Sequence, residues 1–101
     1  MVYLVRTAEV INNWEKAWEF ANKMTGYFKE NYEEIKISKL LTRISGAVNE
    51  YTWILGFESL ADEEKAALKM VKDDKYFDLM RDIEDSFINL NVNLYKEIYK
   101  K

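Results

Sequence analysis

An alternating run of bulky side chains near the middle of the chain most limits what it can fold into. The segment EYTWILGF, residues 50–57, is typical of a β-strand, in which successive side chains point to opposite faces. One of these faces carries Tyr51, Trp53, Leu55 and Phe57. A face with this much apolar volume needs a large apolar surface packed against it.

A helix start follows this strand directly. Ser59 is a favourable N-cap residue, and the acidic cluster at residues 62–64 suits the positive end of a helix dipole. We therefore interpret the cluster as helix capping and not as a pair of catalytic carboxylates. Apolar residues continue at helical spacing to Phe87, but polar residues 72–75 interrupt them. This interruption predicts two helical pieces with a kink at residues 73–74.

An earlier helix has the clearest periodic pattern in the chain. Asn12 is its predicted N-cap, Glu15 completes a capping box, and residues 31–34 end the helix. Its predicted apolar stripe contains residues three and four positions apart: Trp14, Ala17, Trp18, Ala21, Met24, Thr25 and Phe28. Phe20 and Tyr27 lie off this stripe, so we expect them to contact something other than the domain's own sheet.

Three further segments have strand character: residues 2–10, 35–44 and 89–99. In the second of them, the neighbours Leu40 and Leu41 predict either a bulge or a strand buried on both faces. A turn pattern at residues 45–49 predicts a hairpin between this strand and the next. The last segment alternates regularly, with one apolar and one more polar face.

The order strand, helix, strand, strand, helix, strand is the split arrangement of a ferredoxin-like α+β fold, βαββαβ. Right-handed crossovers place both helices on one face of a four-stranded antiparallel sheet. We expect a single domain over residues 1–101. Its other sheet face would leave large apolar residues in water, so we predict that two sheets pack face to face in a homodimeric α+β barrel.

Composition excludes several kinds of chemistry. The chain contains no cysteine and no histidine, which excludes disulfides, thiolate nucleophiles and metal or haem ligation through these residues. We predict no metal site and no cofactor. The net charge of −3 argues against nucleic acid as a partner. No apolar run reaches the roughly 20 residues of a membrane span, and no leader-like N-terminus is visible, so we expect a cytoplasmic protein without a membrane partner.

Several short segments carry a resemblance to a known family. They are YLVRT at residues 3–7, TRISG at 42–46, the stretch from Asn49 and Glu50 through FESLA at 57–61, and DDKYF at 73–77. These segments resemble the NIPSNAP-type domains of the dimeric α+β barrel superfamily, whose members include antibiotic-biosynthesis monooxygenases and haem-degrading enzymes. The resemblance implies a ferredoxin-like subunit that dimerises through its sheet and has a pocket between sheet and helices.

The chain departs from this family at one position that matters for function. NIPSNAP-type sequences often carry a histidine in the third strand, where this chain has Trp53. Since the sequence has no histidine elsewhere, haem ligation through imidazole is excluded. A histidine-dependent activity of the family therefore does not transfer to this chain.

Seven residues are candidates for lining a ligand pocket: Arg6, Trp14, Trp18, Phe28, Trp53, Tyr76 and Phe77. Tryptophan faces stack on flat aromatic ligands, so the three tryptophans indicate a cavity for such a compound. The alternative is that they fill the hydrophobic core, as aromatic residues at regular spacing usually do. Core packing is the favoured interpretation of the tryptophans.

Arg6 lies in the middle of a strand among apolar neighbours, where an unpaired charge is costly. It either pairs with an acidic residue such as Glu50, Glu58 or Glu97, or lies at the pocket rim, or binds a ligand carboxylate or phenolate. We favour an acidic partner or a place at the rim over a ligand contact, and Arg6 is also the best candidate for contacting an anion.

Amide and phenol groups share the polar face of the last strand: Asn91, Asn93, Tyr95 and Tyr99. They have the hydrogen-bonding capacity to orient a ligand, but a polar seam between two subunits gives the same pattern. We favour the seam.

The sequence leaves three functions open and does not decide whether the chain is an enzyme. The first is binding of a small apolar or aromatic molecule between sheet and helices. The second is a cofactor-independent monooxygenase acting on an electron-rich aromatic compound, assisted by Arg6, a tyrosine and the tryptophan pocket. The third is a structural dimerisation module, which needs no pocket.

Overall fold

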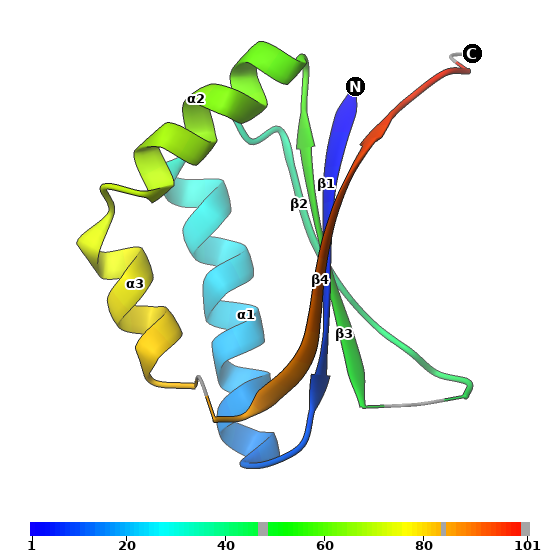
Figure 1. Ribbon diagram of the computed structural model, residues 1–101, viewed down its shortest axis with the longest axis vertical. Helices are drawn as coiled ribbons and strands as arrows, with labels where there is room; N and C mark the ends of the chain where they lie inside the picture. Colours follow the sequence, from blue (N-terminus) through cyan, green and yellow to red (C-terminus); the bar gives the residue numbers. More distant parts are fainter. Residues whose placement is uncertain (47–48, 84, 100–101) are drawn as a thin grey trace.

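The computed structural model describes residues 1–46, 49–83 and 85–99. Within them lie β1 (Val2–Val10), α1 (Trp14–Asn31), β2 (Ile37–Thr42), β3 (Glu50–Phe57), α2 (Leu60–Met70), α3 (Asp74–Arg81) and β4 (Phe87–Lys96). The strands form one antiparallel sheet in the order β2-β3-β1-β4, and the helices lie on one of its faces (Figure 1). This arrangement confirms the predicted ferredoxin-like α+β fold.

The helix-facing side of the sheet is built on β3. Tyr51, Trp53, Leu55 and Phe57 are all buried there, as the alternating pattern predicted. In the central strand pair Arg6 of β1 lies directly opposite Trp53, and residues opposite each other project from the same face. Arg6 therefore faces the helices and not the open side of the sheet.

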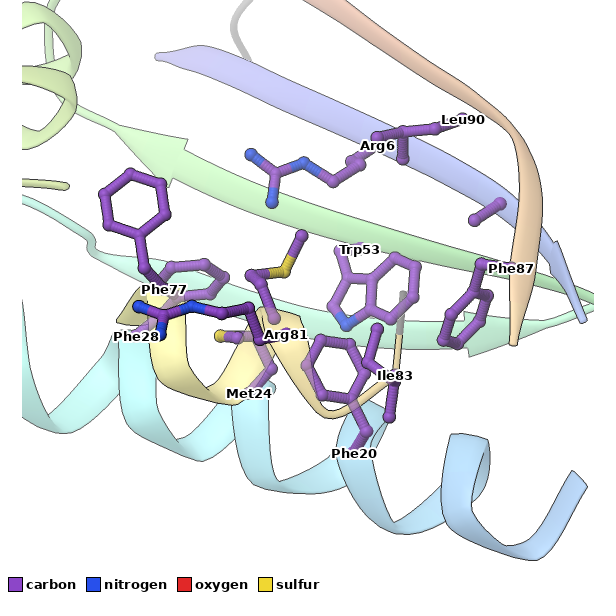
Figure 2. A pocket seen from close by; sticks show the side chains of 12 residues that line it. Arg6, Phe20, Met24, Phe28, Trp53, Phe77, Arg81, Ile83, Phe87 and Leu90 are labelled. Atoms are coloured by element: carbon purple, nitrogen blue, oxygen red, sulfur yellow. The ribbon is translucent and has the colours of Figure 1, made fainter. Parts of the chain in front are cut away.

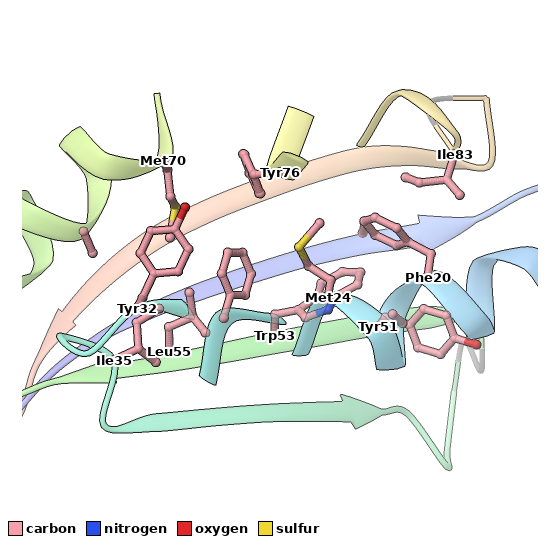
Figure 3. Close-up of a cluster of buried hydrophobic side chains, with 14 of the residues drawn as sticks. Phe20, Met24, Tyr32, Ile35, Tyr51, Trp53, Leu55, Met70, Tyr76 and Ile83 are labelled. Carbon is pink, nitrogen blue, oxygen red and sulfur yellow. The ribbon is translucent and has the colours of Figure 1, made fainter. Parts of the chain in front are cut away.

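The core is formed where α1 packs on this face. Phe28 of α1 and Phe57 of β3 are each only 1% exposed. Figure 3 shows Phe20 and Met24 of α1 in the same buried cluster as Trp53. Truncating a buried phenylalanine to alanine typically costs about 3–5 kcal/mol, so these contacts contribute a large part of the stability of a small domain.

The predicted N-cap of α1 at Asn12 was wrong. The helix begins at Trp14 after Asn13, whose φ of 51° lies in the left-handed region and whose side chain makes no capping bond. The Asn12 side chain instead accepts a hydrogen bond from the Asn13 backbone N–H at 3.0 Å. Asparagine tolerates the left-handed conformation, which allows the chain to turn sharply from β1 into the helix.

The predicted stripe of α1 was wrong at both tryptophans and at Phe20. The buried residues of the helix are Ala17, Phe20, Ala21, Met24 and Phe28. Trp14 and Trp18 are 55% and 50% exposed, so neither belongs to the core. Both sets of residues fit a helical repeat, and the packing of α1 on β3 selects the one that contains Phe20. Trp18 instead lies beside Tyr51 at the edge of the core, with ring centroids 6.0 Å apart.

The second helical region is divided at the predicted position. The Ser59 hydroxyl caps α2 by accepting the Asp62 N–H at 3.2 Å. Asp73 caps α3 in the same manner, accepting the Tyr76 N–H at 3.2 Å. A side-chain cap satisfies a backbone donor that the preceding turn leaves free, so Asp73 starts a new helix in a new direction.

β2 is shorter than predicted and regular. Its pairing with β3 runs without interruption from Ile37 to Thr42, so a bulge at Leu40 was the wrong expectation. Leu40 is paired with Trp53, whereas Leu41 is 48% exposed on the opposite face, so the strand is not buried on both faces either. Residues 47–48 of the predicted turn lie outside the described residues.

β4 begins at Phe87 and contains a bulge that regular alternation did not predict. The register with β1 shifts between Thr7 and Glu9, so that two residues of β4 oppose Ala8. Asn89, with φ of 54°, occupies this irregularity. Phe87 and Leu90 are three residues apart, yet both turn toward the helices, because the extra residue changes which side chains share a face.

The opposite face of the sheet is not covered by any element in the described part of the chain (Figure 1). Val5 is paired with Ile54 there, and Tyr3 with Tyr95. Tyr95 is 54% exposed. Among the described residues, no helix combines the length and the apolar character that crossing a membrane requires.

Candidate functional site

A cavity of about 390 Å³ lies between the sheet and the helices α1 and α3 (Figure 2). Its lining comes from every element except β2 and α2: Arg6, Ala8, Phe20, Met24, Phe28, Trp53, Phe77, Met80, Arg81, Ile83, Phe87 and Leu90. Leu90 and Phe77, which are 56% and 41% exposed, stand where the cavity meets solvent. The hollow is therefore a pocket with an entrance.

Aromatic rings form one end of this pocket. Phe87 lies 5.9 Å from both Phe20 and Trp53, measured between ring centroids, and the latter two are 6.4 Å apart. Tilted and edge-on arrangements at such distances are the favourable ones for aromatic pairs. These rings provide a pre-formed surface on which a flat apolar ligand would pack.

Arg6 brings a positive charge to the wall of the pocket. Its Nη1 donates a hydrogen bond to the Tyr76 hydroxyl at 3.2 Å. The prediction of an acidic partner was wrong within the described residues, whereas the alternative, a place at the pocket, agrees with the structure. Glu50 pairs with Arg43 at 2.9 Å and Glu97 with the N-terminal amine at 3.4 Å, while no ion pair reaches Arg6.

Two buried donors at this wall have no acceptor among the described residues. They are Nε of Arg6 and Nε1 of Trp53, which belong to directly opposite positions on β1 and β3. Trp53 is only 6% exposed, so bulk water does not readily satisfy its indole N–H. Leaving a buried donor unpaired costs roughly 1–3 kcal/mol.

A second guanidinium lies at the edge of the same pocket. Arg81 of α3 lines it but is 68% exposed and pairs with Asp78 at 3.0 Å. Figure 2 shows its side chain near Phe28 and Phe77, on the helix side of the cavity. Its charge is therefore largely screened by solvent and partly neutralised.

A smaller cavity of about 360 Å³ adjoins the first one. Arg6 and Phe77 line both cavities, whereas Tyr76 lines only the smaller one. The hydrogen bond from Arg6 to Tyr76 thus forms part of the partition between them. Glu63 lines the smaller cavity but makes no ion pair with Arg6.

The structure brings five of the seven candidate pocket residues together. Arg6, Phe28, Trp53 and Phe77 line the larger cavity, and Tyr76 lines the adjoining one. The other two, the half-exposed tryptophans of α1, line neither cavity. That any of these residues contacts a ligand stays a prediction.

Several lining residues were not among the sequence candidates. The sequence predicts Phe20 off the core stripe and Met24 on it, and Ile83 carries no pattern that indicates a pocket. Phe87 and Leu90 both line the pocket because of the bulge in β4, and no local sequence pattern predicted this bulge. Phe20 is three residues from Ala17 and so fits a helical repeat, but the stripe that contains Trp14 and Trp18 fits one equally well.

The main cluster of polar side chains outside the pocket is centred on Asp73. Its Oδ2 accepts hydrogen bonds from the Tyr27 and Tyr32 hydroxyls at 2.5 and 2.6 Å. Burial, followed by these bonds, raises the pKa of Tyr27 to about 12 and that of Tyr32 further. Burial alone would raise the pKa of Asp73, but the two tyrosines and the backbone N–H groups of Tyr76 and Lys75 outweigh it and hold that pKa below its ordinary value. An ionised, fully engaged carboxylate of this kind is structural and not an acid–base group.

The polar face of β4 points away from the pocket. Asn91 and Asn93 are paired with Thr7 and Val5 on the open side of the sheet. They therefore cannot orient a ligand held between sheet and helices. Within the described residues, no group of three or more His, Cys, Asp and Glu side chains has the arrangement of a metal site.

No protein-family model and no curated protein matches this sequence significantly. Solved structures with the same fold include a NIPSNAP family protein with unknown function from Agrobacterium tumefaciens. It is 21% identical, with 96% of this chain and 87% of that chain covered and a TM-score of 0.74.

Two further structures extend the comparison. SnoaB, a cofactor-independent oxygenase from Streptomyces nogalater, is 12% identical over 98% of this chain and 94% of its own, with a TM-score of 0.76. An uncharacterized NIPSNAP domain protein from Burkholderia xenovorans is 16% identical over 96% and 94%, with a TM-score of 0.66. These neighbours confirm the resemblance inferred from the short motifs, at the level of the fold.

Proposed function

We propose that this protein binds a small apolar or aromatic molecule in the cavity between its sheet and its helices. The observation that carries the proposal is the cavity itself. Protein interiors are normally close-packed, and ligand sites are typically hollows of roughly 300–1,000 Å³ lined mainly by apolar and aromatic side chains. A pocket of about 390 Å³ in a chain of 101 residues meets this description. A purely structural module would not need such a cavity.

The proposal is tested by filling the cavity. Ala8 is 3% exposed and lines the pocket, so Ala8→Leu places three more carbon atoms inside it. We expect at least a tenfold loss of affinity for a neutral aromatic compound such as 2-naphthamide, followed by quenching of tryptophan fluorescence. Ala61→Leu, on an exposed position of α2, is the matched control. Equal affinity in wild type and Ala8→Leu would argue against this cavity as the binding site.

A cofactor-independent monooxygenase is the second candidate function. It is favoured by the fold shared with an oxygenase of that description and by the Arg6–Tyr76 pair at the wall of the pocket. In such a reaction dioxygen is the oxidant: one oxygen atom enters the aromatic substrate and the other leaves as water, the substrate supplying the electrons. The guanidinium of Arg6 would stabilise the substrate anion formed by loss of a proton. Oxygen uptake with an electron-rich quinol, lost in Arg6→Met, tests this candidate.

A second copy of the chain is the proposed protein partner. The uncovered sheet face carries paired apolar side chains, including Val5 with Ile54, and β4 is exposed along most of its length. Apolar side chains gathered on an uncovered sheet face often mark an interface. Two such faces packed around a two-fold axis would make the homodimeric α+β barrel, with the polar side chains of β4 at its seam.

The remaining parts of the proposal come from the sequence. They are a single domain over residues 1–101, no cofactor, and no nucleic-acid or membrane partner. A cytoplasmic location stays a prediction from the sequence.

A further inference from the structure

We propose that the ligand of the cavity carries a carboxylate, which binds to the Nε side of the Arg6 guanidinium. This inference rests on the proposed function and deepens it. It narrows the ligand from any apolar compound to one with an apolar or aromatic body and a single anionic head.

The first argument is the state of Arg6 in the fold. Its side chain projects from the middle of β1 into a pocket whose other wall residues are almost all apolar. A guanidinium cannot lose its proton, so in such surroundings it needs an anion. The described chain supplies only the neutral hydroxyl of Tyr76 to one of its nitrogens.

The second argument is that the unpaired polar atoms of the pocket are hydrogen-bond donors. Nε of Arg6 is buried without an acceptor, and so is Nε1 of Trp53 at the opposite position on β3. Both atoms are donors, and no buried acceptor of the same pocket stands unpaired among the described residues. These two unpaired donors favour a ligand that accepts hydrogen bonds. The ligand does not need to donate any.

The third argument is the shape of the vacant edge. The bond to Tyr76 occupies Nη1, which leaves Nε and the remaining nitrogen on the other side of the planar group. A carboxylate has two oxygens in one plane and matches such an edge with two parallel bonds. Because the surroundings are apolar, this charged pair is screened less than one on the surface.

Arg81 does not have the same role. It is largely exposed and already paired with Asp78, so the ligand gains little by contacting it. It therefore provides the matched control for Arg6: the same side-chain type, at the same pocket, but in solvent.

The experiment compares two ligands of equal size and shape, 2-naphthoate and 2-naphthamide, at pH 7. Affinities are measured by isothermal titration calorimetry for wild type, Arg6→Met and Arg81→Met. We expect wild type to bind the carboxylate at least tenfold more tightly than the amide. This preference should disappear in Arg6→Met and persist in Arg81→Met. Arg6→Lys, which keeps the charge but loses the planar edge, should retain part of it, and circular dichroism checks that each variant is folded.

The outcomes separate the inference from the function on which it rests. If wild type binds both compounds equally, or if Arg6→Met keeps the preference, the carboxylate assignment is wrong while the apolar pocket stands. If Arg6→Met is unfolded, a reduced preference in folded Arg6→Lys supports the assignment, and full retention there overturns it. If wild type binds neither compound, both the inference and the proposed binding function fail.

Discussion

The hydroxyl of Tyr32 donates a 2.6 Å hydrogen bond to Oδ2 of Asp73, joining the end of α1 to the junction of α2 and α3. The same oxygen accepts from Tyr27, and the other carboxylate oxygen caps α3 through the Tyr76 N–H. One side chain thus orients the helix that carries Tyr76 and Phe77 to the pocket. The position of the pocket wall depends on this carboxylate.

Asp73→Asn should lower the free energy of unfolding by about 1–3 kcal/mol. The amide oxygen of asparagine is a weaker acceptor than a carboxylate for the two tyrosine hydroxyls. Urea denaturation measures the change. Asp74→Asn, one residue further on an exposed position, is the control and should change it by less than about 0.5 kcal/mol. Similar effects of the two substitutions would show that the tyrosine bonds to Asp73 contribute nothing.

The same carboxylate predicts a dependence of stability on pH. The pKa of Asp73 is lower in the folded protein than the value of about 3.9 for an unfolded chain. Its stabilising contribution is therefore fully present above that value and is lost as the pH falls through the folded pKa. The difference in unfolding free energy between wild type and Asp73→Asn should shrink steadily below about pH 4. A difference that stays constant down to pH 2 would contradict this.

The ion pair of Glu34 and Lys69 predicts a second stability effect. Glu34 is only 7% exposed and is bonded to Lys69 Nζ at 2.6 Å, and this hydrogen bond is the main reason why the pKa of Glu34 is lowered. Lys69→Met would leave a buried carboxylate without its partner, at a cost of about 1–3 kcal/mol. Lys72→Met, at an exposed position just after α2 and in no ion pair among the described residues, is the control. If the two variants lose the same free energy of unfolding in thermal or urea denaturation, the pair of Glu34 and Lys69 does not stabilise the fold.

Two glycines should respond to alanine in opposite directions. A Cβ at Gly26 would meet nothing within 4 Å, so neither close packing nor steric need explains this glycine. Gly26→Ala should stabilise the protein by about 0.5–1 kcal/mol. A Cβ at Gly56 would lie 2.9 Å from the Cβ of Ile37, which cannot move away without its backbone. Gly56→Ala should destabilise it by about 1–3 kcal/mol, and the same sign for both variants in urea unfolding would refute the assignment.

The proposed homodimer predicts the effect of a charge on the open sheet face. Ile54 lies opposite Val5 at the centre of that face, so Ile54→Lys should yield a monomer at micromolar concentration in sedimentation velocity. Leu68→Lys, at a 64% exposed position of α2 on the other side of the molecule, should sediment as wild type does. A monomeric wild type would exclude the face-to-face arrangement.

Much of the fold could be predicted because it depends on local patterns. The alternation in β3 gave its buried face correctly, and Ser59 marked the start of α2 through capping that is local in sequence. The polar interruption at residues 72–75 gave the division between α2 and α3, although not the cap that Asp73 forms there. The order of strands and helices then left few topologies. The start of α1 was missed, because the strained turn at Asn13 is set by how the chain leaves the sheet.

The candidate site was predicted less completely. Arg6, Phe28, Trp53 and Phe77 were chosen for their chemical type, and the structure places them around one cavity. Trp14 and Trp18 were chosen by the same reasoning and lie half-exposed elsewhere. Periodicity could not separate these cases, since two overlapping sets of α1 residues have the same spacing.

The sequence by itself determined the class of fold, the order of its elements and the absence of thiol and imidazole chemistry, because these depend on residue types and on neighbours along the chain. Only the tertiary structure decided which face of α1 is buried, that the bulge at Asn89 turns Leu90 toward the helices, and that Glu50 and Glu97, two of the acidic residues expected beside Arg6, bind other partners. Each of these is set by contacts between residues distant in sequence, whose free energies outweigh local preference. The guanidinium of Arg6, which lies at the pocket without an ion pair in the described part of the chain, is one result of that competition.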